Sequence, residues 1–310
     1  MATLLVSHPE CLSHDTGTLH PESSERLRAL LQALDREEFT DLDRRDAPHA
    51  QTAQLARVHD VQHIQYVLEH VPEYGYYSID GDTVLSPMSN QAALRAAGGV
   101  CYAIDAVMAG EGRNAFVAVR PPGHHAGRHT PCGFCLFNNI AVGAMHAREH
   151  HGLQRIGIID WDVHHGNGTQ DIFWSDPNVF YASTHQAPLY PGTGATDETG
   201  THGTIMNIPL PPGTKGDTFL ETLDHDILPA LRAFQPHLVM ISAGFDAHAD
   251  DPLADFKLTA DDYADATRKI LDVAENTCAG RVISVLEGGY DLQALASSAS
   301  AHILTLMNHA

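Results

Sequence analysis

Short apolar runs rich in β-branched residues alternate with longer amphipathic or alanine-rich stretches along most of the chain. The runs predict buried strands over residues 1–7, 115–119, 156–159, 179–183, 238–242 and 281–286. The stretches between them predict helices over residues 20–34, 90–108, 139–149, 219–233, 260–274 and 292–307. This alternation is typical of an α/β protein in which a mostly parallel central sheet is flanked by helices.

Polar motifs follow five of the predicted strands directly. They occupy residues 120–125, 160–165, 183–185, 244–246 and 287–290. In an open α/β sheet, ligands bind at the carboxyl ends of the strands. Because five separate motifs fall at that one edge, the sequence predicts a functional site there.

Length and composition narrow the class of protein. No repeat, low-complexity tract or long linker interrupts the 310 residues, which favours a single domain over residues 1–310. Residues 1–7 carry neither a basic segment nor an extended apolar segment, so we expect a first strand rather than a signal peptide, and a cytoplasmic protein without a membrane partner. A net charge of −21 with only 18 Lys and Arg argues against direct binding of nucleic acid.

Cysteines and histidines differ in what they indicate. The five cysteines are an odd number and give no disulfide framework. Cys132 and Cys135 have the spacing of half a zinc ribbon or of a redox pair, but no second pair exists, so neither role is favoured. Among the 22 histidines, His150 and His151 are interpreted as scattered surface residues, whereas the pairs at 124–125 and 164–165 are embedded in turn-rich motifs.

Asp162 and His164 alternate with Val163 at a strand end, so in extended backbone both side chains point to the same side. Asp246 follows another apolar strand and a glycine. By itself this aspartate would be interpreted as a turn or helix-capping residue. Together the three residues predict an open metal site that suits zinc, although iron(II), cobalt or manganese would also bind.

His124 and His125 lie in a glycine-containing loop that allows both side chains to turn inward. The alternative is a pair of surface histidines. The functional hypothesis is a pair that handles the proton of a metal-bound water, with Asp160 and Asn167 as acceptors that orient the two rings. Tyr290, after two glycines, would then donate a hydrogen bond to the oxyanion formed from a carbonyl.

These motifs together resemble one family. The sequences at 120–126, 133–139, 160–170, 244–246 and 287–290 are similar to those of the zinc-dependent histone deacetylase and acetylpolyamine amidohydrolase superfamily, and Asn167 resembles its second class and bacterial relatives. The resemblance spans nearly the whole chain, from residue 20 to the last helix. It implies an arginase-like α/β fold and hydrolysis of an N-acyl amide.

The resemblance also implies a role for each matching residue. One zinc ion per chain would be held by Asp162, His164 and Asp246. The catalytic group would comprise His125 as general base and acid, His124 as its electrostatic partner, Tyr290 as the residue that polarises the carbonyl, and Asp160 and Asn167 behind the two histidines. A structural potassium ion would be held largely by backbone oxygens of Asp160, Asp162, His164, Ser183 and Thr184.

Substrate binding is expected at the entrance to this site. Gly133 and Phe134 resemble one wall of an acyl-lysine tunnel, and Asp82 falls near a rim residue that holds substrate backbone. The opposite wall falls within residues 183–191. Polyamine-specific relatives carry a glutamate where this chain has Leu253, which favours acylated lysine in a protein or peptide over acetylated polyamine. A catalytically silent acyl-lysine binding protein and a two-metal manganese ureohydrolase are the alternatives.

Overall fold

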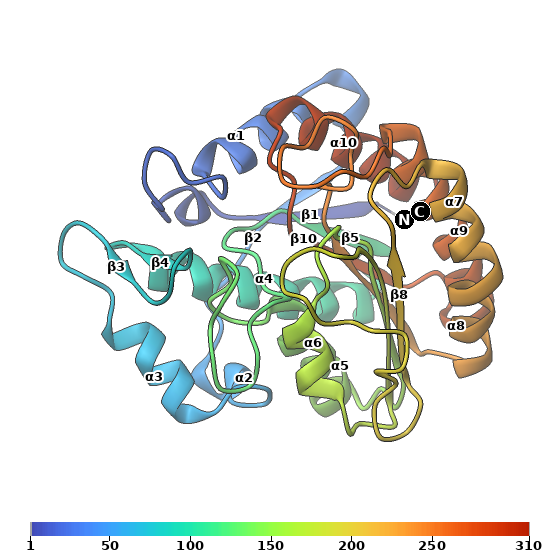
Figure 1. Ribbon diagram of the computed structural model, residues 1–310, viewed down its shortest axis with the longest axis horizontal. Coiled ribbons are helices and arrows are strands. Elements are labelled where there is room, and N and C mark those ends of the chain that lie inside the picture. The colour runs from blue at the N-terminus through green and yellow to red at the C-terminus, as the bar shows by residue number, and fades with distance from the viewer. Residues whose placement is uncertain (1, 310) are drawn as a thin grey trace.

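The computed structural model describes residues 2–309 and contains an eight-stranded parallel sheet (Figure 1). The strand order is β2-β1-β5-β10-β9-β6-β7-β8. The strands are β1 (Thr3–Ser7), β2 (Asp43–Asp46), β5 (Asn114–Val117), β6 (Ile156–Asp160), β7 (Val179–Gln186), β8 (Ile205–Leu210), β9 (Leu238–Ala243) and β10 (Val282–Leu286). A separate antiparallel pair joins β3 (Tyr77–Ser78) to β4 (Val84–Leu85).

Helices cover both faces of the sheet, as predicted. They are α1 (Ser24–Ala33), α2 (Thr52–Leu55), α3 (Val61–Glu69), α4 (Ser89–Met108), α5 (Asn139–His151), α6 (Asn167–Phe173), α7 (Gly216–Thr222), α8 (Leu228–Phe234), α9 (Ala260–Cys278) and α10 (Leu292–Asn308). Short 3₁₀ turns lie at Pro9–Leu12 and Glu37–Phe39. Helices α4 and α5 pack together on one face, and α1, α10, α9 and α8 follow one another over the other (Figure 1).

The six predicted strands are the six interior strands of the sheet. Within this eight-stranded sheet, sequence reasoning missed only the edge strands β2 and β8. The first reads Asp-Arg-Arg-Asp, and the second contains Pro209, which has no N–H to donate to a neighbouring strand. Charge and proline are common on sheet edges because one side of such a strand is unpaired, and they hide the apolar signal.

The helix predicted over 219–233 is divided. An α-helix ends at Thr222, a π-helical turn covers Leu223–Ile227, and α8 begins at Leu228. Pro229 has no N–H to bond four residues back, so the continuous α-helical pattern cannot persist there, and the Leu228 N–H donates instead to the Leu223 carbonyl, five residues back.

The five polar motifs meet because their strands are neighbours. Strands β5, β10, β9, β6 and β7 are consecutive in the sheet, and all run parallel. Their carboxyl ends therefore present all five motifs along one continuous stretch of the same edge. This confirms the predicted fold class and gives the motifs a common location.

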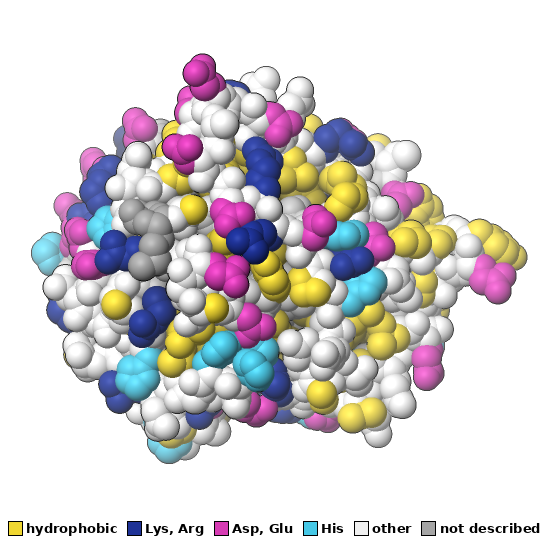
Figure 2. Space-filling model, turned by 180° about the vertical axis from the view of Figure 1, so that it is seen from behind, with side chains coloured by type: hydrophobic (Ala, Val, Ile, Leu, Met, Phe, Trp, Pro, Cys, Tyr) yellow, Lys and Arg dark blue, Asp and Glu magenta, His cyan; other side chains and the backbone are white. Residues whose placement is uncertain are grey.

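One cluster of buried apolar side chains extends from β1 at the start of the chain to α10 at its end. We propose on this basis that residues 1–310 form a single domain. The face shown in Figure 2 carries acidic side chains dispersed among basic ones, without one patch of a single sign. Among the described residues no helix has the length and apolar character needed to cross a bilayer, and the cytoplasmic location stays a prediction.

Gly143 sets how closely α5 approaches α4 and the sheet. A Cβ at this position would collide with Val100, and Met240 and Ile104 would also lie too close. We expect Gly143→Ala to lower the free energy of unfolding by about 1–3 kcal/mol, because overpacking outweighs the better helix propensity of alanine. Urea unfolding followed by circular dichroism measures the loss. Adding Val100→Ala should recover part of it, and two purely additive losses would contradict the steric explanation.

Candidate functional site

Three metal-binding side chains come together where β6 and β9 end. The Nδ1 atom of His164 lies 3.1 Å from Oδ1 of Asp162 and 3.0 Å from Oδ2 of Asp246. All three side chains are buried, and one ligand atom from each lies within 4.8 Å of the others. The structure thus brings together the three residues that the sequence proposed as metal ligands.

Backbone groups hold the two carboxylates in place. The Val163 N–H donates to Asp246 over 2.9 Å, and the Gly288 N–H donates to Asp162 over 2.8 Å. A side chain at Gly288 would collide with both carboxylates, and one at Gly244 would collide with Asp162. The glycines of these motifs are therefore needed for close approach of the backbone to the carboxylates.

The charge of the group favours a cation. Burial and the neighbouring charge of Asp162 raise the pKa of Asp246 to about 7. Burial opposes a charged His164, yet the hydrogen bonds that its ring makes to both carboxylates raise its pKa to about 10. Two buried carboxylates that share one imidazole lack a second counter-charge, which a divalent metal ion would supply.

His124 lies beside this group and is held by Asp160. Its Nδ1 atom is 3.0 Å from Oδ2 of Asp160, which also accepts a hydrogen bond from the hydroxyl of Tyr181 over 3.1 Å. Burial would lower the pKa of His124, but the charges of Asp160, Asp162 and Glu287 outweigh it and raise that pKa well above its usual value. A protonated imidazole is therefore fixed next to the metal ligands.

His125 lies against His124 with the opposite electrostatics. The two ring centroids are 4.0 Å apart, and Nδ1 of His125 is 2.7 Å from Oδ1 of Asn167. Burial and then the charges of His124 and His164 lower the pKa of His125 well below its usual value. Both acceptors predicted from the sequence, Asp160 and Asn167, are in contact with the expected histidines.

Glu287 and Arg26 also support the site, and sequence reasoning gave neither a role. Glu287 accepts hydrogen bonds from the backbone N–H groups of Gly123 (2.6 Å) and His124 (3.1 Å), and so fixes the histidine loop. Arg26 donates to the backbone carbonyls of Glu287 and Gly289, and its guanidinium lies 4.8 Å from the centroid of the Tyr290 ring. The sequence did hold a signal for Arg26: it is a charged residue inside a leucine-rich helix, and it lies four positions after Glu22, a spacing that allows an ion pair.

Comparison with known proteins identifies the relatives of this site. Residues 20–306 match the histone deacetylase domain. The chain belongs to the histone deacetylase family. It is 42% identical over 298 residues to a probable deacetylase of Archaeoglobus fulgidus, an alignment that covers 94% of this chain and 82% of the relative.

Two further relatives extend the comparison. The chain is 40% identical over 276 residues to the histone deacetylase-like amidohydrolase of Pseudomonas aeruginosa, covering 87% of this chain and 72% of the relative. The crystal structure of the HDA15 HD domain superposes with a TM-score of 0.93 at 35% identity, covering 99% of this chain and 88% of that one. The arginase/deacetylase fold is thereby confirmed. Family membership makes this chain a deacetylase-family hydrolase whose substrate is an acylated amine.

Aromatic rings flank the approach to the site of this histone deacetylase family member. Phe134 meets Tyr290 edge to face with ring centroids 6.0 Å apart. Tyr190 lies 5.1 Å from His125 and 6.5 Å from His164, also between ring centroids. Tyr190 lies within residues 183–191, where the opposite wall was expected, and it is the candidate for that wall.

The Cys132–Cys135 segment is a turn that carries Phe134, and it is not a metal or redox site. The Cys135 N–H donates to the Cys132 carbonyl, which closes a turn with positive φ at Gly133 and Phe134. A Cβ at Gly133 would lie 2.6 Å from the ring of His125, so glycine is required there. All five cysteines are free thiols.

A hollow of about 700 Å³ opens at the rim, with His20, Asp82 and Phe134 among its lining residues. Asp82 and Phe134 thus line the same hollow, and the role of Asp82 at the rim stays a prediction. A smaller hollow of about 380 Å³ lies on another side of His125, with Cys132 and Asn167 in its lining. Neither hollow includes the proposed metal ligands among its lining residues.

The three remaining predicted positions, Leu253, Ser183 and Thr184, lie on two different elements near the site. The Leu253 N–H donates to Asp251, whose other carboxylate oxygen accepts the Tyr290 N–H over 2.7 Å, so Leu253 belongs to the loop that holds Tyr290. Ser183 and Thr184 are buried on β7, where Ser183 pairs with Asp160 of β6 in the sheet.

Glu22 should be a strong contributor to stability, because it neutralises two buried arginines. It pairs with Arg26 over 2.9 Å and with Arg120, and all three side chains are fully buried. Glu22→Gln leaves these cations without a counter-charge, so we expect a loss on the order of 3–5 kcal/mol at pH 7. Urea unfolding measures it, with the exposed Glu25→Gln as a control expected to change stability by less than about 0.5 kcal/mol.

The same variant has a defined pH dependence. Burial raises the pKa of Glu22, but the two guanidinium groups outweigh it and lower that pKa from 4.5 to about 2. A lowered carboxyl pKa stabilises the fold above the unfolded pKa and loses its effect as the pH falls from about 4.5 toward 2. The difference between the natural protein and Glu22→Gln should therefore shrink between pH 5 and pH 3. A difference that stays constant would contradict a charged Glu22.

Proposed function

We propose that this chain is a zinc-dependent amidohydrolase that removes an acetyl or other acyl group from the side-chain amine of lysine in proteins or peptides. The observation that carries the proposal is the convergence of Asp162, His164 and Asp246 beside an adjacent pair of histidines with opposite charge preferences. In such a pair, one histidine can carry a positive charge while its neighbour accepts and donates a proton.

Zinc is the proposed metal, with Asp162, His164 and Asp246 as its ligands. Two carboxylates and one imidazole leave coordination positions open, as catalytic zinc sites require. When bound, the ion would act as a Lewis acid and make water nucleophilic at neutral pH. We further propose that backbone oxygens of Asp160, Asp162 and His164, with Ser183 and Thr184, hold a structural potassium ion.

His125 is proposed as the general base and acid. The Asn167 side-chain oxygen can only accept, so it fixes the proton of His125 on Nδ1 and leaves the lone pair on Nε2. Because burial and its neighbours keep His125 neutral, Nε2 can take a proton from the attacking water. The same nitrogen would then return the proton to the departing amine.

His124 and Tyr290 are proposed to stabilise the charge that develops. His124 stays protonated because Asp160 accepts its Nδ1 proton, so a fixed positive charge faces the reacting group. Burial raises the pKa of Tyr290 well above 10, which keeps its hydroxyl protonated as a donor to the acyl oxygen. Arg26 and Asp251 hold the peptide bond that precedes this tyrosine, Arg26 through the Gly289 carbonyl and Asp251 through the Tyr290 N–H.

Three observations favour this function over the alternatives. A silent acyl-lysine binder has no need of both histidines and the phenol, and this chain retains all three. A two-metal ureohydrolase needs a longer set of acidic ligands, whereas the group at this edge of the described structure has three members. Leu253 offers no charge to the cationic nitrogen of a polyamine, which supports acyl-lysine over acetylated polyamine.

We expect Tyr290→Phe to reduce turnover on an acetyl-lysine reporter by on the order of 10²-fold or more, since one donor to the oxyanion is lost. The matched control is Tyr76→Phe, which removes an exposed hydroxyl that donates to Asp15. Undiminished turnover in Tyr290→Phe would contradict the assigned role.

The metal requirement is tested on the same reporter. Removal of metal with a chelator should abolish fluorophore release, and addition of zinc should restore it. Restoration that requires two equivalents of manganese would support the ureohydrolase alternative instead. Activity that persists in the metal-free protein would contradict the proposal.

Leu253 should determine how well a polyamine competes with acyl-lysine. Leu253→Glu adds a negative charge beside the loop of Tyr290, so we expect it to raise kcat/KM for acetylspermidine by about tenfold relative to acetyl-lysine peptide, the effect of about 1.4 kcal/mol. Leu253→Gln is the neutral control. An equal gain in both variants would show that charge is not the cause.

A further inference from the structure

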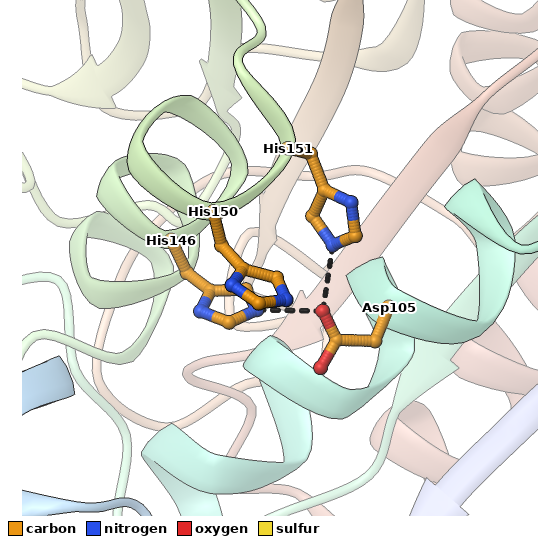
Figure 3. A group of neighbouring side chains, drawn as sticks. All are labelled: Asp105, His146, His150 and His151. Carbon is orange, nitrogen blue, oxygen red and sulfur yellow. Dashed lines mark hydrogen bonds and ion pairs between the residues drawn. The ribbon is translucent and has the colours of Figure 1, made fainter.

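A second group of metal-binding side chains lies between α4 and α5, apart from the deacetylase site. Asp105 comes from α4, and His146, His150 and His151 come from the last two turns of α5 (Figure 3). One ligand atom from each of the four lies within 4.8 Å of the others. His150 and His151 do lie at the surface, as the sequence suggested, but they are not isolated, because α4 brings the carboxylate of Asp105 to them.

The four side chains are already oriented around one point. Oδ1 of Asp105 lies 2.7 Å from Nε2 of His146 and 2.6 Å from Nε2 of His151 (Figure 3). The ring of His150 stacks on that of His146 with centroids 5.0 Å apart. Burial would raise the pKa of Asp105, but the hydrogen bonds from His146 and His151 outweigh it and lower that pKa, so the carboxylate is ionised.

We propose that Asp105, His146, His150 and His151 bind one zinc ion. Three imidazoles and one carboxylate complete a tetrahedral set, which is the coordination of a closed structural zinc site. His146 and His150 are four residues apart and so share one face of α5. The site lies at the carboxyl end of that helix, where the helix dipole favours a cation. His150 is exposed and His151 is partly exposed, so the ion can enter from solvent.

Arg57 opposes zinc binding through one hydrogen bond. Its guanidinium lies 2.8 Å from Nδ1 of His146 and, because arginine can only donate, Nδ1 must accept and the ring proton must sit on Nε2. Zinc needs the lone pair of Nε2, so the proton must move to Nδ1 and Arg57 must withdraw. Glu149, 3.0 Å from Arg57, offers the guanidinium its alternative partner.

The site would act on the scaffold rather than on the reaction. Asn139, the first residue of α5, donates to the Pro121 carbonyl in the loop of the catalytic histidines. His151 ends the same helix, so at 1.5 Å per residue the cluster lies roughly 18 Å farther along it. A zinc ion there would cross-link α4 to α5 at the end remote from the deacetylase site.

The test is the number of zinc ions bound per chain after equilibrium dialysis, measured by elemental analysis. His150→Asn/His151→Asn should bind one ion fewer than the natural protein. The control His202→Asn/His225→Asn changes two exposed histidines outside the cluster and should bind the natural number. The difference of one ion is the result that matters, because it does not depend on whether the deacetylase site also holds zinc. An unchanged number in the His150/His151 variant would overturn the proposal.

Two further measurements address affinity and cross-linking. Arg57→Met removes the donor to His146, so zinc should bind this site roughly tenfold more tightly, the size of effect that groups behind metal ligands commonly have. Zinc should also raise the Tm of the natural protein by more than that of His150→Asn/His151→Asn. Unchanged affinity in Arg57→Met, or equal Tm shifts in the two proteins, would contradict the four-residue site.

Discussion

Two carboxylates buried at the ends of neighbouring strands are the constraint on which the rest of the structure depends. Asp162 follows β6 and Asp246 follows β9, and because these strands pair in parallel, the two buried acids lie at the same edge of the sheet. Their charge is offset in part by His164 and by two backbone N–H groups. Glycine is required at 244 and 288 because any side chain would occupy the space of a carboxylate. The charge buried at this sheet edge thus favours a bound cation, and it replaces apolar packing there.

Another buried carboxylate, that of Glu22, links the loop of the histidine pair to the loop of Tyr290. Its partner Arg120 stands at the start of the loop that carries the histidine pair, and its partner Arg26 holds the backbone before Tyr290. The loops follow adjacent strands, β5 and β10. One side chain from the segment just before α1 therefore fixes the relative position of groups that we propose act on the same acyl carbonyl, which is the pre-organisation that catalysis requires.

The sequence was sufficient where the signal is local or periodic. The six interior strands are continuous apolar runs because both of their faces are buried, and the proposed ligands follow directly from them. The edge strand at 43–46 consists of charged residues, so nothing in its composition indicates a strand. Arg26 and Tyr190 were missed because their contacts join segments far apart in the chain, Arg26 with Gly289 and Tyr190 with His125. Sequence alone indicates which residues can do chemistry, and the fold decides which of them meet.

The histidines make this dependence on the fold clear. His302 is fully buried beside two hydroxyl groups, and burial alone lowers its pKa to about 3. His124 is equally buried, yet three nearby carboxylates raise its pKa well above 6.5. His125, adjacent in the chain, faces an amide instead of a carboxylate and is neutral. Part of this difference arises from the partners of the two rings, Asp160 at the end of β6 and Asn167 at the start of α6. An amide carries no charge to offset burial and the charges of His124 and His164. The segment from β6 to α6 thus helps to determine the charge of a histidine pair contributed by another strand, and so which of the two rings is able to accept a proton.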